Sequence, residues 1–260
     1  MSNRIQIAKE QFADFLEQAN LSPEEVTAKF LVIHRTLLER SSTLDSPNFN
    51  GFHSDDLKLL FDEYDRLFFD GGCRKLLGNL NLTFRISPRM TRAGGKTTQT
   101  IYRTRPHEPD YEIAVASTLI FQSFQNFDRP IIVTGLECHN RLEALQRIFE
   151  HELIHLAELL TWGRSKCSQK RFQSIAGRFF GHTDHRHQLV TPREEAQKIH
   201  GVRTGGRVRF SIEGKEYEGV VNRITKRATV LVRDRKGQRY SDGKKYAKFY
   251  VPVQLLTPLD

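Results

Sequence analysis

The segment from about residue 141 to residue 160 constrains the fold more than any other part of the chain. Six apolar residues recur in it at steps of three and four, which predicts a helix with one face on a core: Leu142, Leu145, Phe149, Leu153, Leu156 and Leu160. The run His151-Glu152-Leu153-Ile154-His155 lies in the same segment and places two histidines on another face. Because Ile148 and Leu159 flank them there, we expect this helix to be covered on both sides.

The H-E-x-x-H spacing indicates a metal site. Two imidazoles at positions i and i+4 can hold one Zn²⁺, and the carboxylate between them can act as a general base toward water. The alternative is that His151 and His155 are hydrogen-bonded core histidines, or exposed by chance, since so short a motif arises by chance in roughly a few per cent of such chains. We predict that both histidines bind zinc and that Glu152 is the catalytic residue.

Composition limits the class of protein. With 260 residues, 38% of them hydrophobic, the chain can bury a core of one or two domains. It has no run of 18 apolar residues and its N-terminus lacks the apolar stretch of a secretion signal, so we expect neither a membrane partner nor export. Cys73, Cys138 and Cys167 are an odd count without C-x-x-C spacing, which favours a reducing cytoplasm and excludes a cysteine zinc ribbon.

The positive charge is concentrated near the end of the sequence. Residues 201–260 contain 14 Lys and Arg against 6 Asp and Glu, whereas the other 200 residues contain 26 and 25. A basic module on a near-neutral body is typical of nucleic-acid binding, although a merely solvated basic surface is the alternative. The residues expected to contact phosphates include Arg207, Arg209, Arg223, Lys226 and Arg227.

Four tyrosines of this module could add stacking on bases: Tyr217, Tyr240, Tyr246 and Tyr250. For any one of them, ordinary packing within a strand is at least as good an explanation.

The order of expected elements predicts an α+β fold. Two helices over residues 4–40 and a loop form an N-terminal extension (1–50), followed by a strong helix from Ser54 to about Leu77 that Gly71-Gly72 can interrupt. Strands are expected at 80–86, 97–102, 111–116 and 130–134, giving a three- to four-stranded sheet before the motif helix. A helix from Ser168 to Gly181 ends the second domain (51–190), and a linker helix (191–201) follows.

Residues 202–260 have a different texture, with short alternating segments separated by turns every eight to twelve residues. Five such strands predict a small all-β barrel of the SH3-like kind.

Residues 54–182 resemble the SprT-like zinc metalloprotease family, some of whose members act on proteins attached to DNA. Apart from H-E-x-x-H, the resemblance is carried by these segments: Leu67-Phe68-Phe69-Asp70, Pro88-Arg89-Met90, Ala93-Gly94-Gly95 and the strand 111–119. It implies an endopeptidase with a protein substrate, and a nucleic-acid partner that is DNA rather than RNA. The family usually has a zinc ribbon after the protease domain, and the basic β module would take its place here.

The third zinc ligand departs from the family pattern. The family has a histidine in His-Gly-x-x-aromatic before the next helix, and Cys167 occupies that place in this chain. His182 follows the same helix and is the second candidate, while His185 or His187 are others. The helix between Cys167 and His182 spans roughly 18 Å, so the two are mutually exclusive as ligands of one ion. Cys167 as a small buried residue and His182 as a capping residue are the non-ligand alternatives.

The leading hypothesis is a cytoplasmic zinc endopeptidase acting near nucleic acid. If the strand around residues 113–117 lies at the edge of the cleft, it could pair with an extended substrate. A metalloprotease fold without catalysis that binds nucleic acid, or a small-molecule metallohydrolase, are the alternatives.

Overall fold

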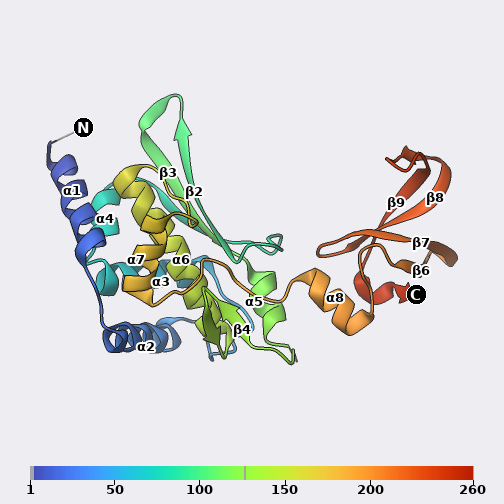
Figure 1. Cartoon of the computed structure of the whole chain (residues 1–260), viewed down its shortest axis with the longest axis horizontal. Helices are drawn as coiled ribbons and strands as arrows, with labels where there is room; N and C mark the ends of the chain where they lie inside the picture. The colour runs from blue at the N-terminus through green and yellow to red at the C-terminus, as the bar shows by residue number, and fades with distance from the viewer. Residues whose placement is uncertain (1–2, 126, 260) are drawn as a thin grey trace. The chain divides into compact units, whose positions relative to one another are not determined.

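The computed structural model describes residues 3–125 and 127–259, and its contacts divide the chain into two compact units, Met1–Leu189 and Val190–Asp260 (Figure 1). Residues 1, 2 and 260, at the outer ends of the expected N-terminal extension and β module, lie outside the described part, as does residue 126. No helix in the described ranges is long and apolar enough to cross a membrane.

The first unit combines helices with two small sheets, as expected for an α+β fold. Its helices are α1 (Asn3–Gln18), α2 (Pro23–Arg40), α3 (Ser54–Phe68), α4 (Gly72–Leu77), α5 (Ser117–Ser123), α6 (Arg141–Trp162) and α7 (Lys170–Phe180). Its strands are β1 (Leu82–Ile86), β2 (Gly95–Tyr102), β3 (Arg105–Val115), β4 (Ile131–Val133) and β5 (Leu136–Cys138). The two N-terminal helices contribute buried residues, among them Leu16 in α1 and Ile33 in α2.

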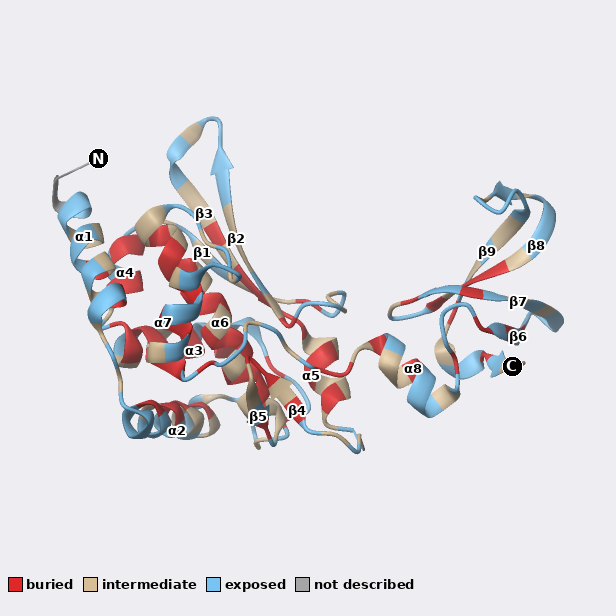
Figure 2. Ribbon diagram, viewed as in Figure 1, coloured by how far each residue is buried: buried red, intermediate tan, exposed pale blue. Residues whose placement is uncertain are grey.

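Helix α6 is the centre of this unit. It begins where the Asn140 side chain accepts a hydrogen bond of 2.9 Å from the Glu143 amide, and it ends at Gly163, whose φ of 66° suits glycine. All six residues of the predicted apolar stripe are buried, which confirms that prediction. Strands β2 and β3 and helices α3, α4 and α7 contact α6, so buried residues lie along its length (Figure 2).

The three-stranded sheet has the order β1-β3-β2, with β1 parallel and β2 antiparallel to β3. Strand β3 is therefore central, and β2 has one edge that pairs with no other described strand. The expected fourth strand is not part of this sheet, because β4 pairs only with β5 in a separate ribbon. Thr134 (φ 55°) and Gly135 (φ 82°) form a tight turn that folds the chain straight back onto itself.

The predicted interruption of the second strong helix occurs between α3 and α4. Asp70 (φ 50°) and Gly71 (φ 71°) adopt left-handed conformations there. The Asp65 carboxylate accepts hydrogen bonds of 2.9 Å from the amides of both Cys73 and Arg74, and so caps α4 from within α3.

The second unit contains α8 (Pro192–His200), a 3₁₀ turn η1 (Val253–Leu255) and an antiparallel sheet of order β10-β6-β7-β8-β9. Its strands are β6 (Arg207–Ile212), β7 (Lys215–Ile224), β8 (Ala228–Arg239), β9 (Lys245–Val251) and β10 (Thr257–Pro258). Ala196 of α8 packs into the same core as Val208, Phe210 and Val230 of the sheet.

This sheet is open, which corrects the expectation of a closed barrel. Strands β9 and β10 lie at its two ends, and the described residues show no pairing between them. Strand β10 has two residues, and one of them is Pro258, which has no N–H to donate. It is therefore too short to complete a ring of strands.

Candidate metal site and catalytic residues

The two motif histidines lie on the face of α6 that points toward α7 and β2. Their ring centroids are 4.9 Å apart, and the Phe172 ring of α7 lies 4.8 Å from His151 and 4.6 Å from His155. Burial lowers the pKa of His151 to about 3 and that of His155 to about 4. Both imidazoles are therefore neutral near pH 7, the form in which they can bind a metal.

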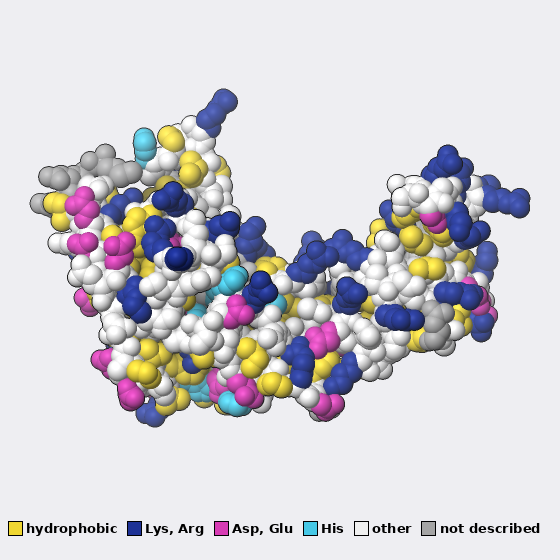
Figure 3. Space-filling model, in the orientation of Figure 1, with side chains coloured by type: hydrophobic (Ala, Val, Ile, Leu, Met, Phe, Trp, Pro, Cys, Tyr) yellow, Lys and Arg dark blue, Asp and Glu magenta, His cyan; other side chains and the backbone are white. Residues whose placement is uncertain are grey.

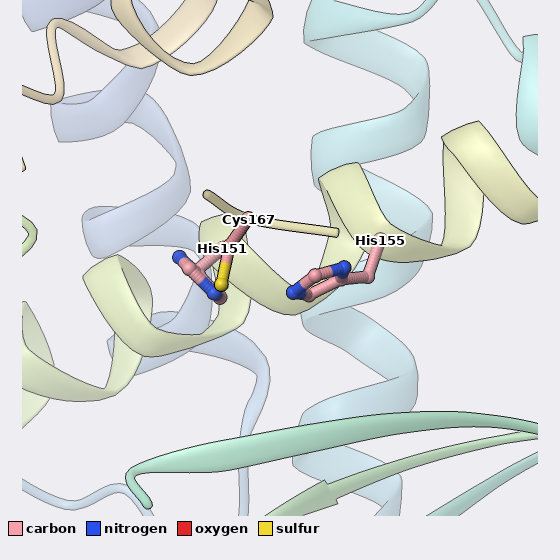
Figure 4. Close-up of side chains that lie close together, drawn as sticks. All are labelled: His151, His155 and Cys167. Atoms are coloured by element: carbon pink, nitrogen blue, oxygen red, sulfur yellow. The ribbon is translucent and has the colours of Figure 1, made fainter. Parts of the chain in front are cut away.

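Cys167 joins this pair from the loop between α6 and α7. One ligand atom from each of His151, His155 and Cys167 lies within 4.8 Å of the others. Figure 4 shows the Cys167 side chain beside the two imidazoles, with its sulfur drawn over the His151 ring and the His155 ring to the right. Gly163 ends α6 in a left-handed conformation, and four residues then bring Cys167 back over the motif. This group could hold a metal ion, and it contains the first of the two predicted third ligands.

His182, the other predicted third ligand, lies elsewhere. It follows Gly181 at the end of α7, its side chain is 1% exposed, and its Nε2 is 2.8 Å from a carboxylate oxygen of Glu150. Glu150 also accepts hydrogen bonds from Tyr64 and Arg147, so these groups form a polar network inside the core, in which the Nδ1 of His182 has no partner among the described residues. Burial lowers the pKa of His182. Cys167 precedes helix α7 and His182 follows it, so the two predicted ligands lie at opposite ends of this helix, and only Cys167 joins the metal group.

His185 and His187 line the same groove as the metal group but are not part of it. The Nε2 of His187 donates to the Arg92 carbonyl at 3.1 Å, and its Nδ1 accepts from the Leu189 amide at 3.4 Å. Both ring nitrogens of His187 are therefore engaged. His185 lies 3.4 Å from the carboxylate of Asp184.

Glu152 is buried beside the metal group and is held by strand β2. The Thr97 hydroxyl lies 2.8 Å from a carboxylate oxygen of Glu152 and 2.8 Å from its backbone carbonyl. Gly95 leaves room for the carboxylate, because a Cβ there would lie 2.6 Å from Glu152 Cγ. Burial raises the pKa of Glu152 to about 7, which suits a group that exchanges protons near neutral pH.

A hydrogen-bonded chain orients His155. Its Nδ1 lies 2.7 Å from the Ser165 hydroxyl, which donates to the Glu158 carboxylate at 2.5 Å. The single hydroxyl proton goes to that carboxylate, so Ser165 accepts from Nδ1–H and leaves Nε2 of His155 free for a metal. Arg171 completes the chain at 2.6 Å from the fully buried Glu158 and stacks on the Trp162 ring.

The metal group opens into a groove of about 760 Å³. One wall is residues 94–99 around the start of β2, and another is residues 185–187. This corrects the expectation that the strand around residues 113–117 forms the edge of the cleft. Those residues belong to or follow β3, which is paired on both sides. The edge strands of this sheet are β1 and β2, and β2 is the one that lines the groove.

In the basic unit the structure separates the predicted phosphate-binding residues into two groups. Arg207 and Arg209 both pair with Glu218, at 3.4 and 2.8 Å. Arg223 lies on β7 and Lys226 and Arg227 in the turn that follows it, and none of the three forms an ion pair with another described residue.

Three polar residues that contact the motif residues were not among the predicted site residues: Thr97, Glu158 and Ser165. Glu158 carries a usable signal, because it lies seven positions after His151 and hence on the same helix face. Thr97 and Ser165 carry none, since each acts through a loop or strand whose position depends on tertiary packing.

Comparisons with family models, with curated proteins and with solved structures found no match to this chain. The chemistry of the site therefore follows from the residues that the structure brings together.

Proposed function

We propose that this chain is a zinc-dependent endopeptidase of the SprT-like kind. The observation that carries the proposal is the convergence of His151, His155 and Cys167 within 4.8 Å, with the buried carboxylate of Glu152 on the same helix. Imidazole and thiolate are the ligand types that zinc takes most often, and three protein ligands leave one position for chemistry.

The residues present fit such an ion. The Nδ1 of His151 is buried and has no hydrogen-bond partner among the described residues, which is costly unless another group satisfies the ring. His155 is fixed by Ser165 in the tautomer that presents Nε2. When bound, Zn²⁺ would supply Lewis-acid activation of water and of the scissile carbonyl.

Glu152 would perform the proton transfers. Its carboxylate accepts a proton from the attacking water, the new C–O bond forms as the peptide C–N bond breaks, and the same proton goes to the leaving amine. Thr97 holds the carboxylate during this exchange. A metal site without catalysis would not require a carboxylate buried at this position.

The groove favours a polypeptide over a small molecule. The free edge of β2 offers unpaired backbone N–H and C=O groups beside the metal group, and an extended chain can add to such an edge as a further strand. The resemblance of residues 54–182 to SprT-like proteases supports the same substrate class. Association with DNA is part of the proposal and is supported by the charge of residues 201–260.

The test is metal analysis and proteolysis with the full chain. We expect about one zinc per chain, lost in the H151A/H155A double variant. Glu152→Gln keeps the shape of the side chain, so zinc and fold should persist while cleavage of an unfolded protein substrate falls about a hundredfold or more. Equal cleavage by the Glu152→Gln variant, or full zinc retention without the histidines, would contradict the proposal.

A further inference from the structure

The strand register of the second unit places several cations on one face of the five-stranded sheet. Arg207 pairs with Val220, Val220 with Leu231, and Leu231 with Lys248, so these four side chains form a row across the sheet. Parallel rows align Arg223 with Thr229 and Tyr250, and Arg233 with Tyr246. We call the surface that these three rows form, together with the neighbouring pair Arg209 and Glu218, the outer face.

The opposite face is the covered one. Val208, Phe210, Val221 and Val230 point to it and form the core with Ala196 of α8. Side chains alternate along each strand, so the residues of the outer face point away from that core. Figure 3 shows Lys and Arg side chains at several places on the visible surface of this unit, with hydrophobic side chains between them.

The outer face has more positive charge than its own carboxylates can balance. Strand β7 places two carboxylates on it, those of Glu216 and Glu218. Arg207 and Arg209 share the carboxylate of Glu218. Arg223 on β7, Arg233 on β8 and Lys248 on β9 form no ion pair with another described residue. Arg233 does interact with the nearby Asp242 carboxylate, whose pKa it helps to lower, and the Lys248 ammonium lies 5.6 Å from the centre of the Tyr240 ring. With Asp242 included, five cations face three carboxylates, so this surface keeps a positive charge for an anionic partner.

Large apolar side chains are exposed among these cations. Tyr250 is 65% exposed, although a tyrosine within a strand normally packs, and Val220 in the neighbouring row is 39% exposed. Tyr246 is more fixed, because its hydroxyl donates to Asp242 at 2.7 Å and its ring contacts Tyr240 edge-on. Tyr250 thus offers a free ring within the same surface as the cations of β7 and β9.

We propose that the outer face binds single-stranded nucleic acid, with phosphates on Arg223, Arg233 and Lys248 and a base stacked on Tyr250. Aromatic rings between cations on a sheet surface suit unpaired bases, whose faces are free to stack, whereas a duplex hides those faces. The inference deepens the nucleic-acid association of the proposed function and does not depend on the peptidase activity.

The test is fluorescence anisotropy of the full chain with labelled oligo-dT and with a duplex of equal length. Tyr250→Leu should weaken binding of the single strand about tenfold, and Tyr250→Trp should restore it, since stacking needs the ring. Replacing Arg223 and Lys248 by alanine should lower the slope of log affinity against log salt by about 0.7 for each phosphate that is no longer neutralised.

Lys215 and Lys245 supply the matched control. Both belong to the same sheet and carry the same charge, but the register places them on the opposite side of their strands. The K215A/K245A variant should bind oligo-dT like the wild type. Circular dichroism checks that each variant is folded, and the large exposure of Tyr250 makes its replacement harmless to the core.

The outcomes separate the two proposals. Wild-type protein that binds neither probe overturns the association with nucleic acid altogether. Duplex binding as tight as oligo-dT binding, with no effect of Tyr250→Leu, keeps that association and overturns the single-strand site. Equal losses in the control variant also overturn the assignment to the outer face.

Discussion

Gly95 offers the sharpest test of how the fold positions Glu152, the proposed catalytic carboxylate. A Cβ at this position would lie 2.6 Å from Cγ, 2.7 Å from Oε1 and 2.9 Å from Cδ of Glu152. Carbon atoms in contact normally stay about 3.5 to 4.0 Å apart, so Gly95→Ala must displace the carboxylate or β2 by about 1 Å. The backbone of Gly95 is not in a left-handed conformation, so the substitution acts through this contact.

We expect Gly95→Ala to lower the rate of peptide cleavage about a hundredfold, because a displacement of about 1 Å at a reacting group has an effect of that size. The cost in unfolding free energy should be about 1 to 3 kcal/mol, typical of an overpacked site. Zinc content should not change, since the clash involves Glu152 and none of the three proposed ligands, His151, His155 and Cys167.

The assay measures cleavage rate, zinc content and thermal unfolding of wild type, Gly95→Ala and the control Gly51→Ala. A Cβ on Gly51 would meet no atom within 4 Å, so the control should behave like the wild type. Wild-type cleavage by Gly95→Ala would refute the role of this contact. Loss of zinc together with activity would equally refute it, because the glycine would then support the metal site as a whole.

Two further predictions concern the metal. Ser165→Ala should weaken zinc binding about 10- to 100-fold in a chelator competition, because His155 loses the group that fixes its tautomer. Ser165→Thr keeps the hydroxyl and should restore the affinity. Unchanged affinity in the alanine variant would contradict this prediction. Cys167→Ala should weaken zinc binding by about a hundredfold or more, whereas His182→Ala should leave zinc unchanged. His182→Ala should lower the unfolding free energy by about 1 to 3 kcal/mol, measured in urea, because it removes a buried hydrogen bond to Glu150. The reverse pattern would make His182 the ligand.

The sequence pattern was sufficient to predict those features that depend only on residues close together in the chain. The apolar stripe of α6, its two histidines and the break at Gly71 depend on residues within a few turns of each other. The i and i+4 spacing fixes both imidazoles on one face whatever surrounds the helix. These features could therefore be predicted from the sequence.

The third member of the metal group could not be decided in this way. Cys167 and His182 are separated by α7, and the choice between them depends on how that helix packs on α6. Packing of Phe172 against both histidines brings the start of α7, and hence Cys167, toward the motif. Sequence position identified Cys167 and His182 as the main candidates for the third ligand, and the packing of α7 on α6 brings only Cys167 to the two histidines.

Strand order was the other feature beyond the reach of local patterns. The alternating pattern locates β2 and β3 but does not show which of them is central, because an apolar run is compatible with either position. The parallel pairing of β1 with β3 leaves β2 at the edge. That single fact moves the expected substrate-binding strand from residues 113–117 to residues 95–99.

A cysteine ligand and a buried general base are complementary in such a site. A thiolate places more negative charge on zinc than an imidazole does, so water activated there is a weaker acid. An ordinary carboxylate would then be a poor base, whereas burial raises the pKa of Glu152 to about 7 and makes it a stronger one. Gly95 and Thr97 are what permit that burial, since one leaves the space and the other supplies the hydrogen bond. In the proposed site, the thiolate of Cys167 and the raised pKa of Glu152 would therefore complement each other, with the hydrogen bond from Thr97 limiting how far burial raises that pKa.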